Sequence, residues 1–114
     1  MNPNPLGDLM KQAGRMRKDM ERVQEDLKER YVDASVGGGL VEATFNGQQE
    51  LVKIRIDPKT VAPGNDGSAD MGLLEDLVTA AVSQGLEKSR ALMKEEMRKA
   101  TGGLGLEGML PGLF

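Results

Sequence analysis

Two runs of alternating apolar and polar residues between Gly37 and Pro58 constrain the fold of this chain most. The apolar members are Val41, Ala43 and Phe45 in the first run and Val52, Ile54 and Ile56 in the second. A period of two residues is typical of a strand with one buried face. Asn46-Gly47 separates the runs and tolerates a positive φ, so the pair predicts a β-hairpin turn. Pro58 cannot donate a ladder hydrogen bond and is expected to end the second strand.

A further strand is predicted immediately before this hairpin. In Tyr31 to Val36, the apolar residues Val32, Ala34 and Val36 alternate with polar ones. Gly37-Gly38-Gly39 then turns the chain into the next strand. A glycine-rich loop can cradle phosphate, but that motif needs a Lys-Ser/Thr pair or a helix behind it, whereas a strand follows here. The three glycines therefore favour a tight connection between strands.

A long amphipathic helix is predicted from about Leu6 to Arg30. Its apolar residues follow one another at alternating steps of three and four, which is a heptad pattern. We call these residues the seam: Leu6, Leu9, Ala13, Met16, Met20, Val23 and Leu27. Such a helix is about 37 Å long and exceeds the body of a small domain. It is expected to project or to pair with another chain, the alternative being that it lies on its own sheet.

The face opposite the seam carries a stripe of cations. Its members are Lys11, Arg15, Lys18 and Arg22, and Arg17 lies in the same segment. From Lys11 to Arg22 the chain has five basic and two acidic residues, a local charge of +3, although the whole chain carries −3. The stripe is a candidate nucleic-acid surface, and an ordinary solvated helix face remains the alternative.

A second long helix is predicted from Met71 to about Ala100, after a loop spanning residues 61–70 in which Asp70 is the N-cap. Gly102 is expected to end it. The segment 77–82 is apolar nearly all round, which predicts burial against both the sheet and a partner chain. Further along, Arg90, Lys94 and Arg98 recur every four residues and are a second candidate basic surface. Cations near a helix C-terminus also suit the helix dipole, so this cluster has a structural explanation too.

Composition excludes several classes of protein. The chain of 114 residues predicts one domain, and its 3% aromatic content predicts a thin core that oligomerisation would supplement. It contains no Cys and no His, which removes thiol chemistry, the usual metal ligand and the usual general base. No nucleophile has a base beside it, so we expect no enzyme, no cofactor and no metal. The absence of a signal-peptide pattern and of an apolar run of roughly 20 residues predicts a soluble cytoplasmic protein.

The order of several motifs resembles the YbaB/EbfC family of bacterial nucleoid-associated proteins over nearly the whole chain. These motifs are Gly37-Gly38-Gly39-Leu40-Val41, Phe45-Asn46-Gly47, Lys53-Ile54-Arg55-Ile56-Asp57-Pro58, Leu74-Glu75-Asp76-Leu77-Val78, Thr101-Gly102-Gly103-Leu104-Gly105-Leu106 and Pro111-Gly112-Leu113-Phe114. The resemblance implies an α+β domain of order α-β-β-β-α and a homodimer whose helices project from a central three-stranded antiparallel sheet. It also implies DNA binding through the helices that can change DNA conformation, in nucleoid organisation and gene regulation, without catalysis or metal.

These observations together predict a YbaB-like DNA-binding domain over residues 1–102 and a flexible glycine-rich tail over residues 103–114. Duplex DNA and a second copy of the chain are the expected partners, with no membrane and no small-molecule substrate, in the cytoplasm and nucleoid. Phosphate contacts should supply most of the affinity. The predicted DNA-binding residues are Lys11, Arg15, Arg17, Lys18, Arg22, Arg90, Lys94 and Arg98. The alternative is a dimeric protein-interaction or chaperone-like module that does not bind DNA.

Overall fold

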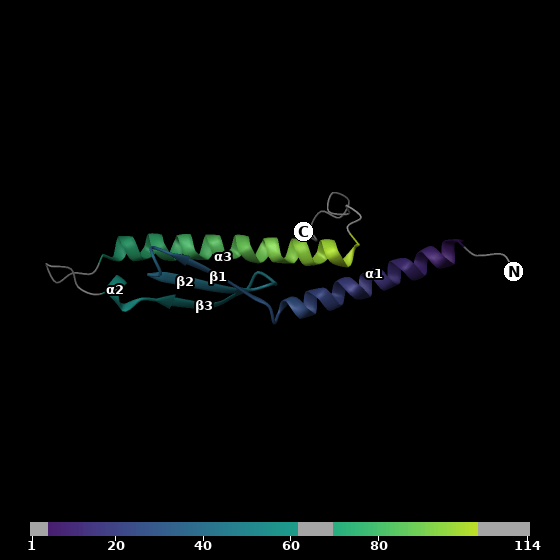
Figure 1. Cartoon of the computed structure of the whole chain (residues 1–114), viewed down its shortest axis with the longest axis horizontal. Helices are drawn as coiled ribbons and strands as arrows, with labels where there is room; N and C mark the ends of the chain where they lie inside the picture. Colours follow the sequence, from purple (N-terminus) through teal and green to yellow (C-terminus); the bar gives the residue numbers. More distant parts are fainter. Residues whose placement is uncertain (1–4, 62–69, 103–114) are drawn as a thin grey trace.

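The computed structural model describes residues 5–61 and 70–102 and has the predicted order of long helix, three strands and long helix (Figure 1). The elements are α1 (Pro5–Leu27), β1 (Tyr31–Val36), β2 (Val41–Asn46), β3 (Leu51–Ile56), α2 (Pro58–Val61) and α3 (Met71–Ala100). The short helix α2 was not predicted. It begins at Pro58, whose fixed φ and missing N–H suit a first helical position. The loop at 62–69 and the tail at 103–114 lie outside the described residues.

The three strands form one antiparallel sheet in the order β1-β2-β3. Ala43 on the central strand lies opposite Ala34 on one side and Ile54 on the other. A bulge interrupts the β2–β3 pairing between Thr44 and Phe45. This arrangement confirms the three-stranded antiparallel sheet that the family resemblance implied.

Helix α3 covers one face of this sheet and forms the core with it (Figure 1). The buried residues of this core cluster are Val41, Ala43, Phe45 and Ala81. Gly85 allows the close approach: a Cβ atom added there would lie 2.6 Å from Cδ2 of Phe45. The opposite face of the sheet is polar, with Thr44 donating to the Asp33 carboxylate over 2.7 Å.

Helix α1 projects from one end of the sheet rather than lying on it (Figure 1). Along the seam, Leu27 is buried, whereas Leu6 and Leu9 are 66% and 62% exposed. Projection was one of the two outcomes expected from the length of the helix. Pairing of the exposed seam with another chain stays a prediction.

The end of α1 at Leu27 corrects the predicted end at Arg30. The backbone N–H groups of residues 28–30 donate to carbonyls three residues earlier, at distances of 3.1–3.2 Å, which tightens the last turn. The backbone N–H of Gly47 donates to the Leu27 carbonyl over 2.8 Å. These hydrogen bonds supply donors to carbonyl groups in the last turn of α1, which have no partner within the helix.

The β2–β3 hairpin was predicted correctly, but its turn differs from the expected Asn-Gly turn. Asn46 is the last residue of β2, and the residue with positive φ is Gln49, at 66°. The Asn46 side-chain oxygen accepts from the backbone N–H groups of Gln48 and Glu50, at 2.9 and 3.1 Å, as in an Asx turn. Gly47 is needed for space, because an added Cβ would lie 2.6 Å from Cδ2 of Leu27.

The other predicted turn and the caps of α3 are confirmed. Gly37, Gly38 and Gly39 all have positive φ, as a tight connection requires. The Asp70 carboxylate accepts from the Leu73 N–H over 2.9 Å, and Gly102 follows the helix with a φ of 68°. Within residues 5–61 and 70–102, no helix is both long and apolar enough to cross a bilayer.

Candidate nucleic-acid interface

The α1 stripe of Lys11, Arg15, Lys18 and Arg22 lies on one exposed face of the projecting helix. Steps of four, three and four residues return to nearly the same direction at 3.6 residues per turn, opposite the seam. Arg17 is also exposed but lies away from this face, because two residues rotate the side chain by about 200° from Arg15. The structure thus brings four of the five predicted α1 cations together.

The α3 cations Arg90, Lys94 and Arg98 are exposed, whereas Ser89 is buried on the other side of the helix. Arg98 binds Glu95 through two hydrogen bonds of 2.7 and 3.1 Å, and this contact lowers the pKa of Glu95. On α1, Arg22 pairs with Asp19 at 3.1 Å. Within the described part of the chain, the other six predicted cations form no ion pair and are open to an anionic ligand.

Charge is distributed unevenly along α3. Residues 71–87 contain three acidic and no basic residues, a charge of −3, whereas residues 88–100 contain five basic and two acidic residues, a charge of +3. The basic half lies at the end of the molecule from which α1 projects (Figure 1). The two segments of charge +3, 11–22 and 88–100, therefore share one end of an otherwise acidic molecule.

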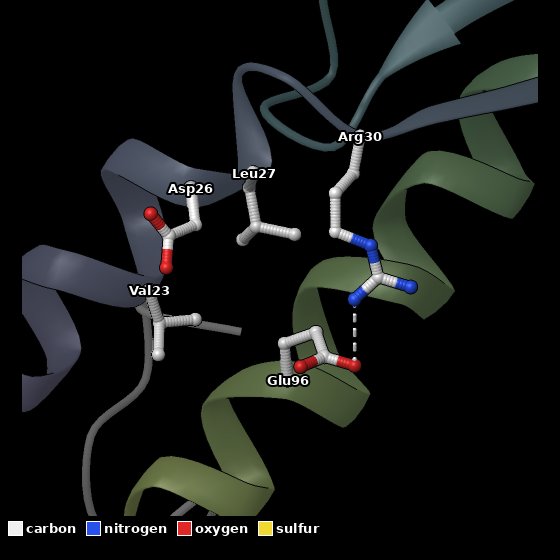
Figure 2. A pocket seen from close by; sticks show the side chains of 5 residues that line it. All are labelled: Val23, Asp26, Leu27, Arg30 and Glu96. Carbon is white, nitrogen blue, oxygen red and sulfur yellow. Dashed lines mark ion pairs between the residues drawn. The ribbon is translucent and has the colours of Figure 1, made fainter.

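The junction between α1 and α3 contains an ion pair that the sequence did not reveal. Arg30, directly after α1, contacts Glu96 of α3 at 3.0 Å, and Lys99 contacts the same oxygen at 3.3 Å. The hydrogen bond from Arg30 is the main cause that lowers the pKa of Glu96, and Lys99 adds to it. Figure 2 shows the pair beside a small open cleft of about 120 Å³. The cleft is lined by Val23, Asp26, Leu27, Arg30 and Glu96.

The predicted cations lie on two different helices, and Arg22 and Arg98 each pair with an acidic residue of their own helix. Arg30 was missed because it follows the last periodic residue of α1 and belongs to no repeating pattern. Lys88 was also missed: its ammonium group donates to the Asp33 carbonyl over 2.7 Å and ties α3 to β1. Across residues 5–61 and 70–102, no group of acidic side chains could hold a metal ion.

Comparison with known proteins identifies the family. The model of the YbaB/EbfC DNA-binding family matches residues 2–104. The chain belongs to this family. The family resemblance seen in the sequence motifs is thus confirmed, and the family is one of DNA-binding proteins rather than enzymes.

Relatives of the chain support the same assignment. A nucleoid-associated protein of Acetivibrio thermocellus is 44% identical over 109 residues, covering 96% of this chain and 89% of that protein. A nucleoid-associated protein of an Anaeromyxobacter species is 46% identical over 101 residues, covering 89% and 93% of the two chains. The crystal structure of an uncharacterized protein from Helicobacter pylori has a TM-score of 0.63 and 26% identity, covering 92% of this chain and 99% of that one. This YbaB/EbfC chain therefore shares its fold with a solved structure.

Proposed function

We propose that this chain is a nucleoid-associated protein that binds duplex DNA as a homodimer, mainly through phosphate contacts. The observation that carries the proposal is the pair of exposed +3 segments, 11–22 and 88–100, at one end of the molecule. Family membership and the names of the relatives agree with it. The protein would then act in the bacterial nucleoid, within the cytoplasm, in nucleoid organisation and gene regulation.

The dimensions of the α1 stripe suit a phosphate backbone. Lys11 and Arg22 are 11 residues apart, which corresponds to about 16 Å of helix axis. Duplex DNA spaces its charges by about 3.4 Å along each strand, so several phosphates lie within reach of one stripe. Contacts of this kind position a protein on DNA without reading its sequence. A second projecting helix in the dimer would allow the duplex to be held at two places, and this arrangement would support a change in DNA conformation.

Homodimer formation is supported by apolar surface that a single chain leaves uncovered. The N-terminal part of the seam is exposed, as are Val52 and Ile56 of the edge strand β3, at 54% and 38%. In the segment 77–82, Ala81 is buried, but Thr79 is exposed and the remaining residues are only half-buried. A second copy would cover such surface, and sedimentation equilibrium should give twice the chain mass of 12.3 kDa.

A salt titration of duplex binding tests the DNA-binding role. Arg15→Glu/Arg22→Glu should remove most binding on any duplex, because the reversed charges repel phosphates. For the wild type, the logarithm of affinity should fall with the logarithm of salt concentration at a slope of about −0.9 per phosphate contacted. The measurement is fluorescence anisotropy of a labelled duplex at several salt concentrations.

The matched control is Lys53→Glu/Arg55→Glu on the exposed polar face of the sheet, which changes the net charge by the same amount. This control should retain most of the affinity and the salt slope of the wild type. Equal reductions of affinity in the two variants would mean that net charge alone causes the effect. An unchanged salt slope in Arg15→Glu/Arg22→Glu would mean that DNA does not contact the α1 stripe. The second outcome would favour the dimeric protein-interaction or chaperone-like alternative.

A further inference from the structure

The β2–β3 turn, residues 47–50, contacts both long helices. Toward α1, the Gly47 N–H donates to the Leu27 carbonyl over 2.8 Å, and the Gln48 side-chain amide donates to the Gln24 carbonyl over 2.5 Å. Toward α3, the Gln49 N–H donates to the Ser89 hydroxyl over 2.9 Å. The turn therefore forms a hydrogen-bonded link between the projecting helix α1 and helix α3, which covers the sheet (Figure 1).

The α3 side of this link is fixed. Ser89 is fully buried, and its hydroxyl both donates to the Asn46 carbonyl over 2.7 Å and accepts from the Gln49 N–H. Every buried side-chain polar atom of residues 5–61 and 70–102 has a hydrogen-bond partner. Removal of the Ser89 hydroxyl would therefore leave these two backbone groups without this partner, which is costly.

The α1 side of the link is equally close-fitting. An added Cβ at Gly47 would lie 2.6 Å from Cδ2 and 2.8 Å from the carbonyl oxygen of Leu27. The second of these atoms is backbone, so α1 itself would have to shift. The Gln24 carbonyl lies in the last turn of the helix, where the Lys28 N–H bonds Glu25 instead, and the Gln48 amide supplies its partner.

The turn contacts the C-terminal end of α1, and the basic stripe of this helix lies far from that end. Lys11 is 16 residues from Leu27, so a tilt of about 10° at the base of α1 displaces it by about 4 Å. That displacement is comparable to the spacing of about 3.4 Å between charges along one DNA strand. A small change at the turn is therefore enough to move the stripe from one phosphate to the next.

We propose that Gly47 and Gln48 are positioning residues that set the direction of α1 relative to α3, and so the spacing of the two basic surfaces on a duplex. This inference rests on the proposed function, in which both surfaces contact DNA. Neither residue touches DNA in this arrangement. Each acts through the C-terminal turn of α1.

The direction of α1 can be measured directly because the chain has no cysteine. Gln12→Cys and Gln84→Cys place spin labels at exposed positions on α1 and α3. Double electron–electron resonance then gives the distance between them, with the labelled chain diluted into excess unlabelled protein so that only distances within one chain are recorded. Gly47→Ala should shift this distance by several ångströms, and Gln48→Glu, which adds no bulk but removes the donor, should broaden its distribution.

Duplex affinity is measured for the same variants without labels. Both should bind more weakly, with a salt slope shallower by about 0.9 for each phosphate that the protein no longer neutralises. Gln49→Ala is the matched control, because its side chain contacts Met93 of α3 and not α1. It should leave the label distance and the affinity unchanged. If Gly47→Ala fails to fold, Gln48→Glu still provides the test.

An unchanged distance distribution in both variants would overturn the positioning role, even if affinity fell. A changed distribution with wild-type affinity and salt slope would overturn it as well, since orientation would then have no consequence for DNA. Failure of the proposed function itself would give a different result. In that case Arg15→Glu/Arg22→Glu would bind duplex DNA as tightly as the wild type, whatever the label distances show.

Discussion

Helices α1 and α3 have similar patterns but different surroundings. Each has an apolar stripe and a basic stripe, yet α3 is buried at points along most of its length and α1 only at Leu27. The buried residues of α3 include Ala81, Gly85 and Ser89, which are small and spaced by four. The seam of α1 is built mainly of Leu and Met. Small residues let α3 approach the sheet closely, whereas bulky ones leave α1 with a surface that its own sheet does not cover.

The largest expected effect separates the two ends of the α1 seam. Leu27→Ala should lower the free energy of unfolding by about 2–5 kcal/mol, as is typical of a buried leucine. Leu9→Ala removes the same atoms from a side chain that is 62% exposed, so its cost within one chain should be close to zero. Urea unfolding at two protein concentrations measures both.

The concentration dependence sharpens this comparison. If a second copy covers the seam, Leu9→Ala should also destabilise the protein at high concentration. This effect should shrink as dilution favours dissociation, because Leu9 is exposed in the separated chain. A cost of Leu27→Ala below that of Leu9→Ala at every concentration would contradict the structure of the α1 base.

A second comparison uses one substitution in the two helices. Gly85→Ala should destabilise the fold by about 1–3 kcal/mol, because the new Cβ would lie within 2.7 Å of two ring atoms of Phe45. Gly14→Ala should stabilise the protein by up to about 1 kcal/mol, because alanine favours a helix and nothing lies within 4 Å of its Cβ. Thermal melts of the two variants should therefore move in opposite directions. A shift of the same sign in both would mean that α3 does not fit the sheet as closely as described.

The sequence predicted most of the fold because its elements follow local rules. Alternation identified the strands, the heptad pattern identified α1, and Asp70 and Gly102 marked the ends of α3. The β2–β3 turn was predicted in place but not in form, because Gly47 meets Leu27 from a distant part of the chain, and no local pattern encodes that contact. The eight predicted cations are all exposed, but their contact with DNA stays a prediction. Arg30 and the positioning contacts of Gln48 depend on tertiary structure alone.

The smallest expected effect tests the ion pair at the base of α1. The pKa of Glu96 is lowered chiefly by the hydrogen bond from Arg30 and less by Lys99. A carboxylate with a lowered pKa in the folded state contributes stability above its unfolded value, near 4.5, and loses that contribution as the pH falls through the folded pKa. Arg30→Gln should raise the pKa of Glu96 toward its ordinary value, and Lys99→Gln should raise it less. Carbon-13 NMR of the Glu96 carboxyl group during an acid titration measures both shifts. A larger shift in Lys99→Gln would show that Glu96 is held within α3 and does not join the two helices.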